Sequence, residues 1–332
     1  MKRNFIASLL AFAIILSCVM FTSCGKSSDE SPWRTSWASA TSEADELDKN
    51  ILVFFSNIES DETSQKLNES FNKKSFQKKV AANYVLLNYD FGNQDEKDYL
   101  TLQEGYEMAN KFTVQSLPAI ILATPEGYVL GSVINEDILL PASKVISKIV
   151  SFNKKSKEVT KARKELAEAQ ELDRLYAIDN LISSLDGAYR YLMTDLLSEI
   201  KQADPENETG LVTKYALSFA YVEAIGEYGQ GNAQGAIDIF LKVAENETVP
   251  ADDAQEAYMT ACYLLANAQL GTPEQILELM NKAIEVSPKS KQVESIKQSV
   301  EYMQQFLTSS EAENAESSDN AAQASVENKN AE

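Results

Sequence analysis

The sequence has no histidine and only three cysteines among its 332 residues. Without histidine, the chain lacks the usual general base at neutral pH and the commonest metal ligand. Histidine-dependent triads and histidine-ligated zinc hydrolases are therefore excluded. Cys18 and Cys24 belong to the N-terminal apolar segment, which leaves Cys262 as the one remaining thiol. Because dithiol exchange needs two cysteines within bonding reach, the chain has no pair for that reaction.

Positive charge is also scarce. The chain has 30 basic against 50 acidic residues and a formal net charge of −20. An acidic surface of this kind repels phosphate backbones, and the sequence has no basic patch with interleaved aromatic residues, so no nucleic acid is expected as a partner. Hydrophobic residues make up 44% of the chain, which is enough for the cores of about two domains.

Long apolar runs are absent from the rest of the chain. After the N-terminal segment, no stretch reaches the ~20 consecutive apolar residues that are needed to cross a membrane. At the N-terminus itself, Lys2 and Arg3 precede an apolar segment over residues 5–20. Small residues follow and end at Cys24. This order is typical of a signal peptide, and it resembles the lipobox of bacterial lipoproteins, with Phe21 where leucine is usual.

The lipobox resemblance implies a lipoprotein signal peptide over residues 1–23 and a lipid attached to Cys24. An ordinary secretory signal and an uncleaved anchor are the alternatives. Residues 24–32 are short and polar and would form a tether. We therefore expect a protein of the bacterial cell envelope that is lipid-anchored to a membrane and faces the periplasm.

Residues 33–152 alternate between strand and helix patterns. Apolar runs bounded by polar residues predict strands, and apolar residues at helical spacing predict helices. The expected strands cover residues 51–55, 84–89, 119–123 and 128–133, and the expected helices cover residues 42–48, 61–80, 96–111 and a segment from about Pro141. A turn at residues 124–127 joins the last two strands. The resulting order is β-α-β-α-β-β-α.

This order, with Phe54-Phe55-Ser56 before a turn and Val114-Gln115-Ser116-Leu117-Pro118 before the hairpin, resembles the thioredoxin superfamily. The resemblance implies a cis bond between Leu117 and Pro118 that shapes a peptide-binding groove. Where the family carries its Cys-x-x-Cys motif, this chain has Asp61-Glu62-Thr63-Ser64. Asp61 and Ser64 are therefore degenerate redox-motif positions, and a fold without its chemistry points to binding.

The carboxylates of Glu59, Asp61 and Glu62 admit two interpretations. They could converge as an acid/base pair or a hard-metal cluster. Alternatively, they could stabilise a helix N-terminus by capping it and by complementing the helix dipole. We favour the helix N-terminus, and we expect no catalytic residue, no metal site and no cofactor.

Residues 153–307 show helical patterns with almost no strand signal. Helices are expected over residues 158–174, 175–184, 187–202 and 211–228. Two stretches, from Gly231 to Phe240 and from Gly271 to Pro288, resemble the second helix of a tetratricopeptide repeat. Their offset is 40 residues instead of the family's 34, so an insertion around residues 247–253 is assumed. The expected fold class is α/β plus all-α, a thioredoxin-like βαβαββα domain followed by a tetratricopeptide-like α-helical array.

Repeat-family geometry implies a concave surface lined by the first helix of each pair. The implied contacts are Tyr221, Ile225, Tyr228, Tyr258, Leu265 and Gln269. Tyrosine combines area with a hydroxyl and suits peptide contacts, although a single aromatic at helical spacing is more often part of a core. Cys262 is expected to be a buried structural thiol, with a redox sensor or an intermolecular disulfide as the alternatives.

Residues 308–332 contain one valine and no aromatic residue, so a disordered acidic tail is expected. Taken together, the sequence predicts a membrane-anchored lipoprotein that acts as a non-catalytic adaptor, assembly factor or holdase for a protein or peptide partner in the cell envelope. Thiol–disulfide exchange or redox homeostasis through Cys262 is the enzymatic alternative. A purely structural envelope protein is a third possibility.

Overall fold

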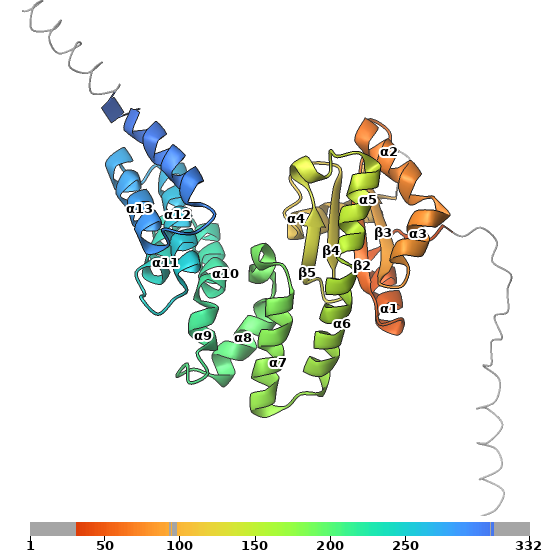
Figure 1. Ribbon diagram of the computed structural model, residues 1–332, viewed down its shortest axis with the longest axis horizontal. Helices are drawn as coiled ribbons and strands as arrows, with labels where there is room; N and C mark the ends of the chain where they lie inside the picture. The colour runs from red at the N-terminus through yellow and green to blue at the C-terminus, as the bar shows by residue number, and fades with distance from the viewer. Residues whose placement is uncertain (1–30, 93, 95–97, 306, 309–332) are drawn as a thin grey trace, which may run out of the picture.

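The first half of the chain is built on a five-stranded mixed sheet (Figure 1). The structure, a computed structural model, describes residues 31–92, 94, 98–305 and 307–308. The strands are β1 (Trp33–Arg34), β2 (Asn50–Ser56), β3 (Tyr84–Asp90), β4 (Ala119–Ala123) and β5 (Val129–Val133). They lie in the order β1-β3-β2-β4-β5; β1, β3 and β2 run parallel, and β4 and β5 are antiparallel.

Strand β2 lies at the centre of the sheet, and every one of its residues is buried. A strand that is covered on both faces shows a continuous apolar run, and Ile51 to Phe55 form such a run. Leu52 pairs with Leu86 of β3 on one side and with Leu122 of β4 on the other. Alternate residues of β2 therefore enter two different cores, one on each face of the sheet.

Helices cover both faces. They are α1 (Trp37–Glu46), α2 (Glu62–Phe71), α3 (Lys74–Val80), α4 (Tyr99–Lys111) and α5 (Ala142–Ser151), with a short 3₁₀ helix η2 (Asn135–Asp137) before α5. Ala40 of α1 and Met108 of α4 pack with Phe55 on one face. Phe71 of α2, Phe76 of α3 and Ile149 of α5 pack on the other. The expected strand and helix order is present, with the two-residue strand β1 added at one edge.

The single helix expected over residues 61–80 is in fact two helices, α2 and α3. Phe71 and Phe76 stack with ring centroids 4.5 Å apart, and both are buried in the same core. In one continuous helix, five residues would place these two side chains about 140° apart. The turn at Asn72 and Lys73 brings both rings onto the core side, which explains why a helical pattern alone missed it.

The second half of the chain is helical. Its helices are α6 (Asn153–Glu168), α7 (Glu171–Ser184), η3 (a 3₁₀ helix, Gly187–Leu192), α8 (Thr194–Ala203), α9 (Leu211–Lys214), α10 (Ala216–Gly229), α11 (Ala233–Ala244), α12 (Ala251–Asn267) and α13 (Pro273–Val286). A further helical stretch begins at Val293. The helices expected over residues 187–202 and 211–228 are each divided in two. In the second case the break lies at Tyr215, which is 1% exposed and whose hydroxyl donates to the Asp179 carboxylate.

The packing does not stop at the expected boundary after Phe152. Helices α5 and α6 run almost end to end along the sheet (Figure 1). Val159 and Leu166 of α6 belong to the same apolar cluster as Leu52 and Phe54 of β2. At the sheet edge, the backbone N–H of Asp186 donates to the Val129 carbonyl of β5 at 2.8 Å. The first helices of the second half therefore complete the core of the first half.

Helices α10 to α13 form a separate core at the far end of the molecule (Figure 1). Its centre is formed by Ala236, Ile237 and Ala261, all fully buried. The proposed signal peptide, the lipid site Cys24, most of the tether and residues 309–332 lie outside the described residues. Within the described part, no helix is both long and apolar enough to cross a membrane.

Candidate functional site

The turn after β2 carries a helix cap where a redox motif would stand. Asp61 has extended backbone angles and accepts a hydrogen bond from the backbone N–H of Ser64, so it is the N-cap of α2. Ser64 is fully buried, and its Oγ accepts from the backbone N–H of Asn57 at 3.1 Å. Glu62 forms an exposed ion pair with Lys66 one turn along the helix. These residues build the start of α2, and the described residues contain no cluster of three potential metal ligands.

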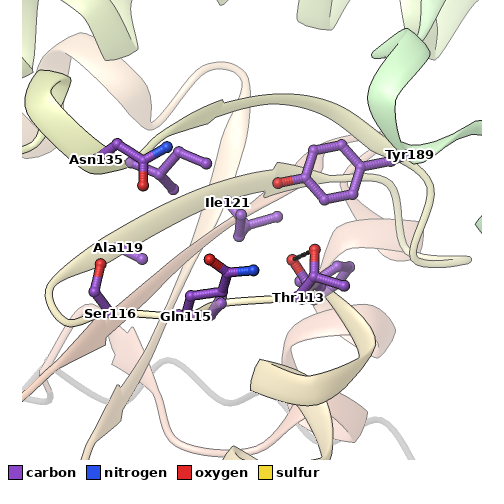
Figure 2. A pocket seen from close by; sticks show the side chains of 10 residues that line it. Thr113, Gln115, Ser116, Ala119, Ile121, Asn135 and Tyr189 are labelled. Carbon is purple, nitrogen blue, oxygen red and sulfur yellow. Dashed lines mark hydrogen bonds between the residues drawn. The ribbon is translucent and has the colours of Figure 1, made fainter. Parts of the chain in front are cut away.

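A small cavity lies beside the cis-proline. The Leu117–Pro118 peptide bond is cis. The residues just before it and those at the start of β4 line a cavity of about 200 Å³. Figure 2 shows the Gln115 amide and the Tyr189 hydroxyl directed toward this cavity, with Ile121 between them. Its rim is polar and uncharged, because Thr113, Ser116 and Asn135 complete it.

Tyr189 was not anticipated as a site residue. It comes from η3 in the helical half, more than fifty residues after β5, and it packs 6% exposed against the core of the sheet. Only the docking of η3 along the β5 edge brings it to the cavity. The sequence holds no local signal for that contact, because it depends on a long-range arrangement of the two halves.

A larger apolar groove lies between α10 and α12, with α11 as its floor. Its volume is about 730 Å³. The lining residues are Tyr221, Ala224, Ile225, Tyr228, Gly229, Ala236, Phe240, Glu256, Met259, Thr260, Tyr263 and Leu264. On each helix these residues recur every three or four positions, which places them on one face. Ile225, Tyr228 and Tyr263 are 60%, 48% and 69% exposed.

Three of the six predicted groove contacts line this groove, namely Tyr221, Ile225 and Tyr228. The prediction for α12 is corrected by the structure. Tyr258 and Leu265 are buried in the core between the helices, and Gln269 lies beyond the end of α12. Because α12 packs against α11 and α13, its groove face is the row of Glu256, Thr260 and Tyr263.

The two rows of α12 differ by rotation about the helix. Tyr258 is two residues from Glu256, which corresponds to about 200° around the helix. Periodicity places residues on a common face but does not say which face a neighbouring helix covers. Tyr263 was therefore missed as a groove residue, although it stands next to Cys262 in the sequence.

Hydrogen bonds fix the centre of the groove. The Tyr221 hydroxyl donates to Glu256 at 3.0 Å and lies 3.1 Å from the Thr260 hydroxyl. Burial raises the pKa of Tyr221 to about 12, so this hydroxyl stays protonated and remains a donor at neutral pH. Glu256 is the one charged residue among the described groove-lining residues. It also borders a second cavity of about 480 Å³, which reaches Arg190 and Asp253.

Cys262 is buried on the core side of α12, 2% exposed, with its Sγ 3.6 Å from the Ile276 carbonyl oxygen. Burial raises the pKa of this thiol to about 12. The thiolate is the reactive form of cysteine, so a thiol of this kind is a poor nucleophile near neutral pH. Cys262 is the free cysteine of the described residues.

Comparison with known proteins agrees with this architecture. The family described as "Thioredoxin-like" matches residues 32–125. The sheet domain is thioredoxin-like. A second family, described as "Uncharacterised protein C-terminal domain", matches residues 211–309. The chain therefore combines a thioredoxin-like domain with a C-terminal helical domain.

Similar individual proteins include an "Uncharacterized protein" of Treponema pallidum (strain Nichols). It is 24% identical over 191 residues, which are 58% of this chain and 64% of that protein, so the match spans less than two thirds of the relative's length. Among solved structures, a "DsbH Oxidoreductase" is 18% identical. The match covers 39% of this chain and 94% of that one, with a TM-score of 0.33.

Proposed function

We propose that this chain is a non-catalytic protein-binding adaptor of the bacterial cell envelope, and that its recognition site is the groove between α10 and α12. The observation that carries the proposal is the exposure of Ile225, Tyr228 and Tyr263 along one apolar groove. Contiguous exposed apolar surface with a polar rim is a mark of protein interaction sites. Tyrosines are enriched among the residues that dominate binding energy.

The expected occupant is an amphipathic segment of a partner protein that carries apolar side chains and a lysine or arginine. The apolar side chains would cover Phe240 and Met259, and the basic group would pair with Glu256. The net charge of −20 favours a basic partner over an acidic one. The acidic C-terminal residues of this chain are unsuited to the groove for the same reason.

A fluorescent amphipathic peptide of about 14 residues, built from leucine, phenylalanine and lysine, tests this proposal by anisotropy titration. We expect saturable binding that Tyr228→Ala/Tyr263→Ala weakens by at least about tenfold. Tyr176→Ala is the matched control, because Tyr176 is 52% exposed and lies on α7 outside the groove. Glu256→Gln should weaken binding and reduce its salt dependence.

Two results would contradict the adaptor proposal. One is a peptide that binds the groove variant and the wild-type protein equally well. The other is a stable dimer in sedimentation that the groove variant abolishes, since a second copy would then occupy the groove.

We further propose that the chain is anchored by a lipid on Cys24, on the strength of the N-terminal sequence pattern. Metabolic labelling with an alkyne-tagged palmitate in a bacterial host should label the wild-type protein and not Cys24→Ser. Equal labelling of both chains, or no labelling of either, would rule the anchor out.

The repeat-like arrangement of α10 to α13 is also part of the proposal. Each pair joins two helices through a short connection, and the second helix of each pair starts at a side-chain cap, Asn232 for α11 and Thr272 for α13. Small side chains at Ala236 and Ala283, both fully buried, support close helix packing. These features support a tetratricopeptide-like array whose concave side is the groove.

A further inference from the structure

A polar crevice that is separate from the cavities described above lies at the opposite end of the molecule from the groove, above the carboxyl ends of β1 and β3. Its volume is about 470 Å³. Thr35 follows β1 and Asn88 lies near the end of β3, while Asn68 of α2 and Asp98 at the start of α4 form the two walls. Ligands of open α/β sheets commonly bind outside the carboxyl ends of parallel strands, and the volume is in the range of small-molecule sites.

The side chains of one wall are held in place by a chain of hydrogen bonds. The indole N–H of Trp33 donates to Asn72 Oδ1 at 3.0 Å, and Asn72 Nδ2 donates to Asn68 Oδ1 at 3.0 Å. Trp33 also packs against Phe54 and Phe71, with ring centroids 6.2 and 6.3 Å away. The ring is therefore fixed from behind while it lines the crevice. The Asn68 Nδ2 group itself donates to none of the described residues.

Asn88 of β3 and Asp98 of the opposite wall also have hydrogen-bond partners in the protein. Ser56 Oγ lies 3.1 Å from Asn88 Oδ1 and 3.3 Å from Asp90 Oδ1, so its one hydroxyl proton is shared between two acceptors, and the Asn88 oxygen faces the protein. Among the described residues, the Asn88 Nδ2 group has no acceptor. Asp98 caps α4 through one carboxylate oxygen, Oδ2. The crevice thus presents two prearranged amide donors, a carboxylate acceptor and an aromatic ring.

No lysine or arginine is among the described residues that line the crevice, and two aspartates are. Phosphate and other anions are therefore disfavoured. A pyranose ring fits this set of groups, because it has a face of C–H groups for an aromatic ring and hydroxyls that both donate and accept. We propose that this crevice binds a neutral sugar unit of a glycan, with the ring on Trp33 and its hydroxyls on Asn68, Asn88 and Asp98.

Intrinsic fluorescence tests the sugar site directly. The chain has two tryptophans, so Trp37→Phe leaves Trp33 as the sole emitter. The probes are chitotriose, cellotriose, maltotriose and mannotriose, each titrated to about 10 mM to reach weak glycan affinities. We expect at least one to change the Trp33 emission saturably. In the same background, Asn68→Ala/Asn88→Ala should bind about tenfold more weakly, because two donors are lost.

Asn281→Ala is the matched control, since Asn281 is an exposed asparagine of α13 far along the chain from the crevice. Circular dichroism of each variant establishes that it is folded, and Asn68→Ala alone serves if the double variant unfolds. An emission that none of the four sugars changes would overturn the proposal. So would a response that the asparagine variants retain, or one that inorganic phosphate produces equally. The sugar titration is independent of the peptide titration of the groove, so each site can fail without the other.

Discussion

At the scale of single residues, Thr113 carries a backbone conformation that suits glycine better. It follows the C-cap of α4 with φ 51°, in the left-handed region that β-branched residues rarely adopt. Thr113→Gly should therefore raise the free energy of unfolding by about 1 kcal/mol. Asn110→Gly, inside the exposed end of α4, should lower it by about the same amount. Urea unfolding of both variants measures the difference.

If Thr113→Gly is neutral or destabilising, the contacts of the threonine must offset its backbone strain. Its hydroxyl donates to the Phe112 carbonyl at 2.8 Å, and its side chain lines the cavity beside the cis-proline. In that case Thr113→Ser, which keeps the hydroxyl without the β-branch, should have the same free energy of unfolding as the wild-type protein.

The thiol of Cys262 gives the clearest pH dependence. Burial raises its pKa to about 12, whereas an unfolded cysteine titrates near 8.5. At pH 8 the folded protein should hold roughly a thousandfold less thiolate than the unfolded chain. A chain that begins at Gly25 has Cys262 as its single cysteine, and its labelling by a thiol reagent should be fast in urea and very slow without it.

The sign of this effect extends to stability. Between the unfolded and the folded pKa, the unfolded chain loses the thiol proton while the folded protein keeps it. The contribution of Cys262 is therefore complete below about pH 8.5 and is lost as the pH rises toward 12. The native labelling rate should increase about tenfold per pH unit from pH 7 to 10. A plateau in that range would argue for a reactive thiol and would revive the redox alternative.

At the scale of elements, the contact between β5 and the α5–α6 junction is set by a glycine. A Cβ on Gly131 would lie 2.3 Å from Cε1 of Phe152. Gly131→Ala should therefore lower the free energy of unfolding by about 1–3 kcal/mol. Gly226→Ala is the control, because no atom lies within 4 Å of the added Cβ in α10. It should stabilise the protein by about 0.5–1 kcal/mol, and thermal unfolding of both variants tests the opposite signs.

Comparison of individual strands and helices shows what the sequence could predict. Buried strands such as β2 are readable because a run like Ile51 to Phe55 has few other uses. Strand β1 has only two residues and no pattern of its own, since pairing with β3 creates it. Likewise, the repeat resemblance implied that Tyr258 lines the groove, whereas the structure buries it in the core. Local patterns specify elements, whereas the neighbours of each face are set by long-range packing.

At the scale of the whole molecule, one apolar cluster joins the two halves of the chain. It extends from Leu52 of β2 through Val159 of α6 to Tyr215 before α10. The core of α10 to α13 is a different cluster. The energetic division of the molecule therefore lies near Tyr215, about sixty residues after the point where the sequence pattern changes from mixed to helical.

This division predicts how truncated chains behave. A chain of residues 31–152 would lack Val159, Ile178 and Leu197, which belong to the same apolar cluster as the sheet and are each at most 1% exposed in the full structure. Each such side chain is worth roughly 1.5–3 kcal/mol, so the loss approaches the ~5–15 kcal/mol that stabilises a typical domain. We expect this fragment to bind a hydrophobic dye and to lack a cooperative thermal transition. A chain of residues 31–215 keeps every buried member of the cluster and should unfold cooperatively. A cooperative transition in the shorter fragment would place the boundary back at Phe152.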